Sequence, residues 1–387
     1  MRIQFISSIH AVQAEAWQAL WCTDYPFIQH AFLALLEDSG CTTAQTGWQP
    51  HHLLLWQGND LVAAMPLFIK THSYGEYVFD WGWADAYHRN GLAYYPKLVC
   101  ALPFTPATGP RLALADGHGV ETCERLAQAI NAEMERLGAS GWHCLFPAAG
   151  QLEAWPGSPT ERLGCQFHWF NQAYESFDHF LAQFNSRKRK TLLRERRKAA
   201  ESGLTIEAQA GTALDAQDWQ AFYQLYQHTY HKRSGRNGYL TPAFFAGLAA
   251  ALPGQVQVVC ARDGDQLQAA ALYFNDSRCL YGRYWGALAD YDSLHFECCY
   301  YQGVELAIRN KLERFDPGAQ GEHKIPRGFT PVLTHSFHQI AHPEFARAID
   351  DFCRQETAHI EAYCEQSRQL LPFKDGVEWV EAWRLIR

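Results

Sequence analysis

The feature that most constrains the fold is an internal repeat whose period spans about half of the chain. The segment LVAAMPLF at 61–68 resembles LQAAALYF at 267–274, and the segment from Trp81 resembles the one from Trp285. Two more matches follow in the same order, 94–95 with 300–301 and 104–109 with 315–321. Solenoid repeats recur every ~20–50 residues, so this much longer period predicts a duplicated domain. A chain of 387 residues is long enough for two cores.

Hydrophobic patterning predicts strands and helices in both halves. In the first half we expect a hairpin at 51–57 and 61–70, a strand at 77–83 and a helix at 120–137. In the second half we expect a hairpin at 256–262 and 266–274, a strand at 278–285 and a helix at 297–311. The sequence therefore predicts an α/β (α+β) fold, with a mixed central sheet flanked by helices in each half. The expected domains are 1–165, 166–345 and a C-terminal helical segment, 346–387, packing on them.

The run FDPGAQGEHKIPRGFTP at 315–331 is the most unusual stretch of the chain. Its glycines and prolines predict a loop. It concentrates Glu322, His323, Lys324 and Arg327, so it is a candidate site, the alternative being a connection with solvated charges. In the first half, the segment Thr108–Arg111 takes the place of these residues, and it is less dense in polar groups. The second half is therefore expected to contain most of the chemistry.

Three segments together resemble a known family. They are the run at 315–331, RYWGALADYDSLHFECCYYQ at 283–302 and SRKRKTLLRERRKAAESG at 186–203. They look like the FemAB-like predicted N-acyltransferases, relatives of the Fem-type transferases with tandem GNAT folds, over about residues 20–345. The resemblance implies two GNAT-like domains and transfer of an acyl group to an amine. Its donor would be aminoacyl-tRNA, as in Fem-type enzymes, or acyl-coenzyme A, as in GNAT enzymes generally.

Two departures from these patterns matter for the expected mechanism. The GNAT pyrophosphate loop Q/RxxGxG/A is not evident in the sequence. The Phe-Lys pair of the Fem-type loop falls on Ile325-Pro326, so Lys324 or Arg327 would have to supply the cation.

Amine acylation requires a proton acceptor, donors for the oxyanion and a surface that holds both substrates. The catalytic candidates are Glu322, His323, Lys324 and Glu297. The substrate-binding candidates are Arg283, Trp285, Tyr300, Tyr301, Gln320 and Arg327. For Glu297 the alternative is a helix-dipole contact, and for Arg283 an internal ion pair. Direct transfer is preferred to a covalent intermediate, because no activated Ser or Cys constellation is present.

The basic run after Asn185 is the candidate site for an anion or tRNA. Its candidate residues are Arg187, Lys188, Lys190, Arg194 and Arg197. The alternative is a solvated helix in a chain whose net charge is −8. Without interleaved aromatic residues, this segment gives no indication that it reads bases.

Composition restricts the remaining function classes. The 18 histidines and 12 cysteines show no metal-ligand spacing, so we expect no metal site. No apolar run reaches the ~20 residues of a membrane span, and no signal peptide is recognised. We expect a cytoplasmic bacterial-type enzyme without a permanently bound cofactor. The alternatives are an acyl-coenzyme A-dependent enzyme acting on a small molecule, and a non-catalytic protein that binds tRNA or a phosphorylated ligand.

Overall fold

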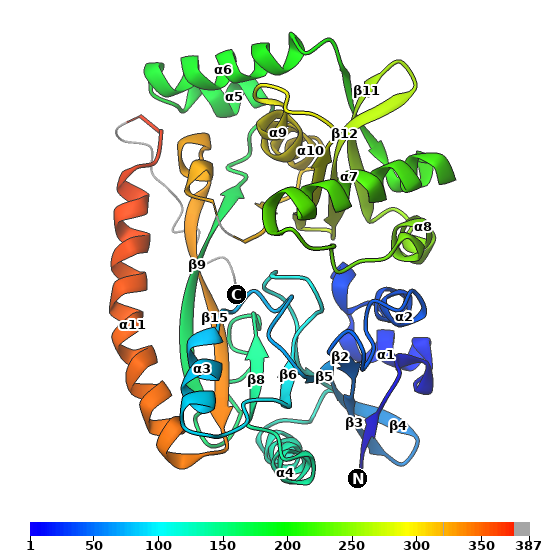
Figure 1. Ribbon diagram of the computed structural model, residues 1–387, viewed down its shortest axis with the longest axis vertical. Helices are drawn as coiled ribbons and strands as arrows, with labels where there is room; N and C mark the ends of the chain where they lie inside the picture. Colours follow the sequence, from blue (N-terminus) through cyan, green and yellow to red (C-terminus); the bar gives the residue numbers. More distant parts are fainter. Residues whose placement is uncertain (320, 375–387) are drawn as a thin grey trace. The chain divides into compact units, whose positions relative to one another are not determined.

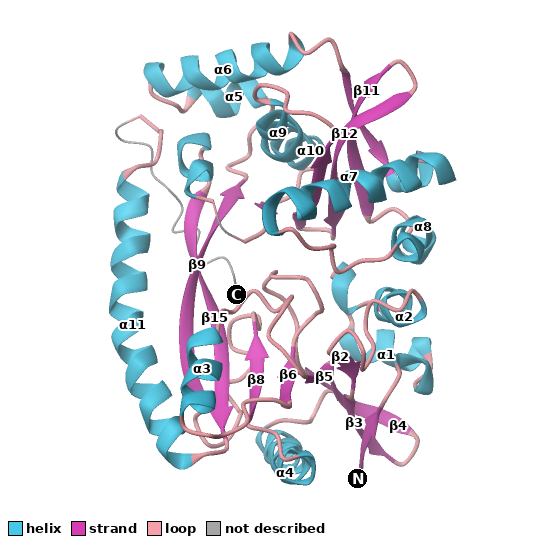
Figure 2. Cartoon of the chain, in the orientation of Figure 1, coloured by secondary structure: helices cyan, strands magenta, loops and turns pink. Residues whose placement is uncertain are grey.

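The computed structural model describes residues 1–319 and 321–374, and the chain divides into two compact units (Figure 1). The first unit comprises Met1–Gly164 and Leu333–Tyr363. The second comprises Cys165–Val332 and the described residues from Cys364 onward. Both units contain helices and strands (Figure 2). In the described part of the chain, no helix has the length and hydropathy needed to cross a bilayer.

The first unit contains two sheets with strand orders β1-β3-β4-β7 and β15-β8-β6-β5-β2. Its strands are β1 (Arg2–Ile6), β2 (Trp48–Pro50), β3 (His52–Gln57), β4 (Asp60–Met65), β5 (Leu67–Lys70), β6 (Lys97–Cys100), β7 (Ala113–Leu114), β8 (Gly141–Leu145) and most of β15 (Thr330–Ile340). Its helices are α1 (Ala14–Trp21), α2 (His30–Asp38), α3 (Trp81–Arg89), α4 (Val120–Leu137) and most of α11 (Pro343–Gln369), with 3₁₀ turns at Ile9–Ala11 and Pro26–Ile28.

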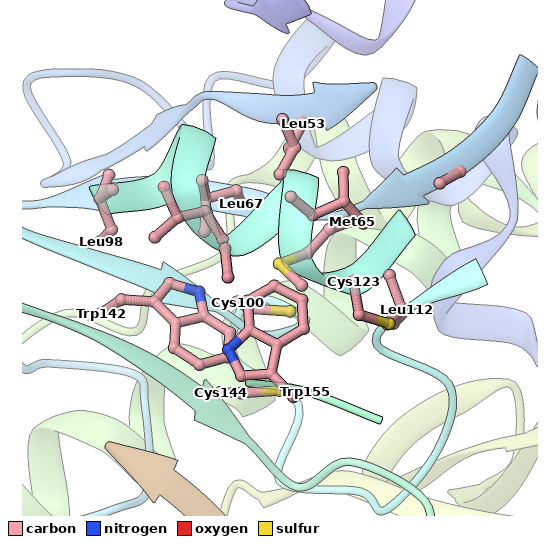
Figure 3. Close-up of a cluster of buried hydrophobic side chains, with 14 of the residues drawn as sticks. Leu53, Met65, Leu67, Leu98, Cys100, Leu112, Cys123, Trp142, Cys144 and Trp155 are labelled. Carbon is pink, nitrogen blue, oxygen red and sulfur yellow. The ribbon is translucent and has the colours of Figure 1, made fainter. Parts of the chain in front are cut away.

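The main core of the first unit lies between α4 and the sheet (Figure 3). Helix α4 buries Leu126, Ile130 and Met134, whose spacing of four residues places them on one face. Trp142 of β8 stacks on Trp155 at 4.8 Å between ring centroids. The helix ends at Gly138, whose φ of 61° suits a left-handed cap, and its bounds are those predicted.

In the second unit, neighbouring strands are hydrogen-bonded in the order β10-β11-β12-β13-β14-β9. Its strands are β9 (Thr160–Phe170, which begins in the first unit), β10 (Thr205–Ala210), β11 (Val256–Asp263), β12 (Gln266–Asn275), β13 (Cys279–Ala287) and β14 (Arg314–Asp316). Its helices are α5 (Phe177–Ala182), α6 (Ser186–Ala200), α7 (Ala216–Ser234), α8 (Pro242–Ala251), α9 (Leu294–Phe296) and α10 (Gln302–Arg309). A π-helical turn lies at Glu297–Tyr301, and 3₁₀ segments lie at Gly211–Ala213 and Glu322–Arg327.

The two units repeat one topology. Antiparallel β11, β12 and β13 correspond to β3, β4 with β5, and β6. In each unit the next pairing is parallel, β6 with β8 and β13 with β14, and helices connect the two strands. The segments 61–68 and 267–274, matched in the sequence, lie on corresponding strands. An α/β fold with a mixed sheet flanked by helices is confirmed.

The other three matches in the repeat were wrong. Trp81 begins helix α3, whereas Trp285 lies on strand β13, and this also overturns the strand predicted at 77–83. Residues 94–95 precede β6, whereas 300–301 lie in the π-helical turn. Segment 104–109 follows β6, whereas Phe315 lies on β14. Aromatic residues in 77–83 resemble a strand, but Trp83 and Tyr87 are both buried at helical spacing.

The last strand of each sheet comes from an unexpected part of the chain. Strand β9 follows β8 in sequence, but its end pairs with β14 in the second unit. Strand β15 follows β14, but it pairs antiparallel with β8 in the first unit, from Ser336 to Ile340. Each unit therefore takes its final strand from the segment that follows the other unit's parallel pair.

Candidate active site

The candidate site begins where two parallel strands separate. Strands β13 and β14 pair only over three residues each, up to Tyr281 and Asp316. A Cβ on Gly282 would lie 3.4 Å from the Pro317 Cα, so glycine allows the loop to leave closely against β13. In α/β sheets ligands bind at the carboxyl ends of parallel strands, and the loop at 317–329 starts at such an end.

A buried ionic cluster fixes the start of this loop. The carboxylate of Asp316 pairs with Arg283 at 3.2 Å and accepts a hydrogen bond from the Gly318 N–H at 2.8 Å. His168 Nε2 lies 3.6 Å from the same carboxylate, and burial lowers the pKa of His168 to about 3. Burial alone would raise the pKa of Asp316, but Arg283, His168 and the Gly318 N–H together outweigh burial, and the pKa falls to about 2. Arg283 thus forms an internal ion pair that holds the loop.

Lys324 lies in the interior of the loop. Its side chain is buried, and Nζ donates a hydrogen bond to the Gly318 carbonyl at 2.6 Å. Burial, with a contribution from Arg283, lowers the pKa of Lys324 to about 8, although Asp316 acts in the opposite direction. The ammonium form therefore predominates at neutral pH and titrates just above it.

His323 lies next to Lys324 and forms a pair with Tyr300. The distance between His323 Nε2 and the Tyr300 hydroxyl is 2.7 Å. Gly321 has a φ of 106°, and a Cβ there would lie 2.5 Å from His323 Cε1, so this glycine lets the imidazole fold back. Burial and the charges of Lys324 and Arg327 lower the pKa of His323 to about 4. The imidazole is therefore neutral at physiological pH.

Arg327 anchors the end of the loop. Its guanidinium donates to both carboxylate oxygens of Glu195 at 2.8 Å and to the Tyr301 hydroxyl at 3.1 Å. It also donates to the His323 carbonyl and lies over the Phe296 ring at 3.4 Å. With these partners Arg327 organises the end of the loop.

Helix α6 is bound to this site by its C-terminal half. Arg196 donates to both oxygens of Glu297, at 2.9 and 3.1 Å, and to Glu305 at 2.6 Å. Glu297 belongs to the π-helical turn, which also presents Tyr300 and Tyr301, and such turns occur frequently at functional sites. Glu297 is buried with both oxygens occupied, so it acts as an anchor for α6.

The N-terminal half of α6 has a different character. Within the described residues, the four cations of this half make no salt bridge: Arg187, Lys188, Arg189 and Lys190. Arg194, in the other half, also makes no salt bridge with a described residue. Arg197, also predicted to bind an anion, pairs with Glu201 at 3.6 Å. No acidic residue occupies the first turn, where the helix dipole makes cations unfavourable. These unpaired cations repel one another and the positive end of the helix dipole, and a bound polyanion would relieve that repulsion.

The structure thus brings most predicted site residues into one neighbourhood. Trp285 packs against His295, with 5.5 Å between the ring centroids, and Glu322 is exposed at the loop surface. Gln320 lies outside the described residues. Sequence reasoning missed Asp316, His168 and Glu195. Glu195 is the only acid between 187 and 198, and that isolation was a usable signal.

At the carboxyl end of β8, the strand that corresponds to β14, the first unit has an arginine bound to backbone carbonyls. Arg111 donates to the carbonyls of Leu145 at 2.8 Å, Ala107 at 2.7 Å and Pro110 at 3.1 Å. A Cβ on Gly109 would lie 2.4 Å from the Tyr25 ring. The arginine there has a structural role, which favours the second unit as the location of the chemistry.

The first unit contains a separate buried charge cluster that no sequence pattern indicated. Lys97 donates to Ser73 at 2.9 Å, to Glu76 at 2.8 Å and to Asp80. Burial raises the pKa of Glu76 to about 7 and lowers that of the adjacent Lys70 to about 7. These groups fix the segment between β5 and α3 to the sheet. No group of three or more His, Cys, Asp or Glu side chains in the described residues could hold a metal.

Comparison with solved structures places this architecture in a defined fold class. The chain is similar to FemX, with a TM-score of 0.52 and 11% identity over 90% of this chain and 100% of the other. It is also similar to the C-terminal domain of a lysylphosphatidylglycerol synthetase from Agrobacterium fabrum. That match has a TM-score of 0.51 and 11% identity, over 87% of this chain and 93% of the other. At such identities the likeness establishes the fold.

The sequence itself establishes the family. The model of the FemAB-like family, described as peptidoglycan biosynthesis/recognition, matches residues 8–375, and the chain belongs to this family. The predicted resemblance is confirmed and extends beyond the expected 20–345. No curated protein matches the chain.

Proposed function

We propose that the second unit transfers an aminoacyl group from aminoacyl-tRNA to an amine of a peptidoglycan precursor or fragment. The observation that carries this proposal is the difference between the two halves of α6. One half provides unpaired cations, and the other half contacts the loop through Glu195 and Arg196. A donor with many phosphates would be held by the first half and aligned with the loop by the second. The family description supports the acceptor class.

The loop residues suit attack of an amine on an ester. The amine nitrogen forms a bond to the carbonyl carbon, and the bond from that carbon to the ribose oxygen then breaks. Lys324, as ammonium, would stabilise the oxyanion formed between these events. Neutral His323 would accept the amine proton. Because Lys324 and Arg327 disfavour an imidazolium, it would pass the proton on to the departing ribose oxygen.

Charge reversal on α6 tests this proposal. Arg187→Glu/Lys190→Glu should weaken binding of aminoacyl-tRNA and reduce the slope of log affinity against log salt by about 0.7–0.9 for each lost phosphate contact. Arg197→Glu/Glu201→Arg, on the same helix, keeps its ion pair in reverse and serves as the matched control. Product would be followed by mass spectrometry with a panel of muropeptide amines.

Three outcomes would contradict the proposal. Equal salt slopes in both double variants would remove the role of α6. Product formed from acyl-coenzyme A but not from aminoacyl-tRNA would establish the other donor. Tight tRNA binding without product, over the whole acceptor panel, would indicate a binding protein.

A further inference from the structure

Two cysteines far apart in sequence meet in the second unit. Cys165 lies on β9 and Cys364 on α11, and their sulfur atoms are 3.0 Å apart. This distance is shorter than ordinary contact between two sulfur atoms and about 1 Å longer than a disulfide bond. Cys364 is buried, whereas Cys165 is half-buried and closer to solvent. Both residues are present as thiols in this structure.

We propose that Cys165 and Cys364 form a reversible disulfide when the protein meets a hydroperoxide. The peroxide oxidises one thiol to a sulfenic acid and releases water or an alcohol. The second thiol then attacks the sulfenic sulfur, the S–S bond forms and a molecule of water leaves. Only a small movement of the two side chains is required. A dithiol reductant reverses the reaction by exchange.

The contact between the two sulfur atoms also affects the rate at which Cys165 is oxidised. The contact with Cys364, together with burial, raises the pKa of the Cys165 thiol, whereas Arg368 acts in the opposite direction. Since the thiolate is the reactive form, oxidation should be slower here than at the exposed Cys22. The disulfide is therefore expected under sustained oxidative exposure.

The disulfide would restrict the movement of the residues that follow α11, and these residues pack against the candidate loop. Beyond α11, Phe373 bridges to Phe184, the Asn185 N–H donates to the Pro372 carbonyl at 2.9 Å, and Lys374 N–H donates to the Gln183 carbonyl at 2.9 Å. The Phe373 ring lies beneath Gly328, where an added Cβ would be 3.0 Å from it. Cross-linking Cys364 to β9 would hold the end of α11 and, through it, this aromatic support.

Peptide mapping of the full-length protein tests the proposal. After prolonged hydrogen peroxide treatment, non-reducing digestion should yield a cross-linked peptide pair containing Cys165 and Cys364, which dithiothreitol removes. Cys165→Ser should abolish the cross-link and Cys22→Ser should retain it. Cys364→Ala provides a second variant, because a small apolar side chain is tolerated at the buried position. The oxidised wild type should resist protease cleavage after α11 better than either cross-link-deficient variant.

The proposal is overturned if both sulfurs remain alkylatable after Cys22 is fully oxidised. It is equally overturned if Cys165 reaches the sulfinic acid without any cross-linked peptide. All of these readouts are independent of transfer activity.

Discussion

Replacing Lys324 should separate catalysis from stability. Its pKa falls from 10.5 to about 8 in the folded protein, and this shift corresponds to roughly 3 kcal/mol of penalty on the buried ammonium. The unfolded chain binds the proton more tightly, so the penalty is complete below about pH 8 and fades as the pH rises toward about 10.5. Lys324→Met should therefore unfold no more easily than wild type at pH 7, despite the lost bond to Gly318.

The same substitution should impair transfer. Removing one preorganised donor to an oxyanion typically lowers kcat by about 10²–10³-fold. In the wild type kcat should fall as the pH rises through about 8, because the ammonium becomes an amine. Lys324→Arg keeps its charge at every accessible pH, so its remaining activity should show no such fall.

The assay is steady-state transfer between pH 6 and pH 10, with urea unfolding of the same preparations. Lys311→Met, at an exposed lysine, is the control and should change neither property. The reasoning is refuted if Lys324→Met retains full activity. It is also refuted if Lys324→Arg shows the same alkaline fall as the wild type.

Three further substitutions test other contacts. Lys97→Met leaves the carboxylates of Glu76 and Asp80 buried without their cation. It should lower the urea-derived stability by about 3–5 kcal/mol at pH 7, with a smaller loss near pH 4, where carboxylates take up protons. Tyr300→Phe removes the hydrogen bond to His323 and should reduce kcat by about tenfold with unchanged thermal unfolding; an unchanged kcat would exclude a role for the pair. Gly328→Ala meets three phenylalanine rings at 2.8–3.0 Å and should cost about 1–3 kcal/mol more than Gly203→Ala, which has a positive φ but open space. Equal costs would show that the rings move aside.

Local patterning predicted those parts of the fold that depend on neighbouring residues. Helix α4 follows from one apolar stripe and a terminal glycine. The polar loop was recognisable because glycines and titratable groups are concentrated in it. Each of these signals lies within a short stretch of sequence, and the structure it predicts forms within that same stretch.

The remainder depends on contacts distant in sequence. His168 and Asp316 lie close together because β9 pairs with β14, and no spacing rule relates the two residues. Glu195 partners Arg327 from a different element, so its role needed the tertiary fold. The aromatic matches in the repeat failed because aromatic residues fill cores in helices and strands alike, as Trp83 and Trp285 do.

The exchange of β9 and β15 has a consequence for how the protein is made. When the ribosome has completed β8, the strand that must pair with it is almost two hundred residues away, at Ser336–Ile340. The edge of β8 that pairs with β15 therefore stays unpaired until the second unit has been synthesised. Such an edge is a template for wrong pairing. A chain cut at Gly164 should aggregate on expression, and adding β15 as a separate peptide should rescue its solubility.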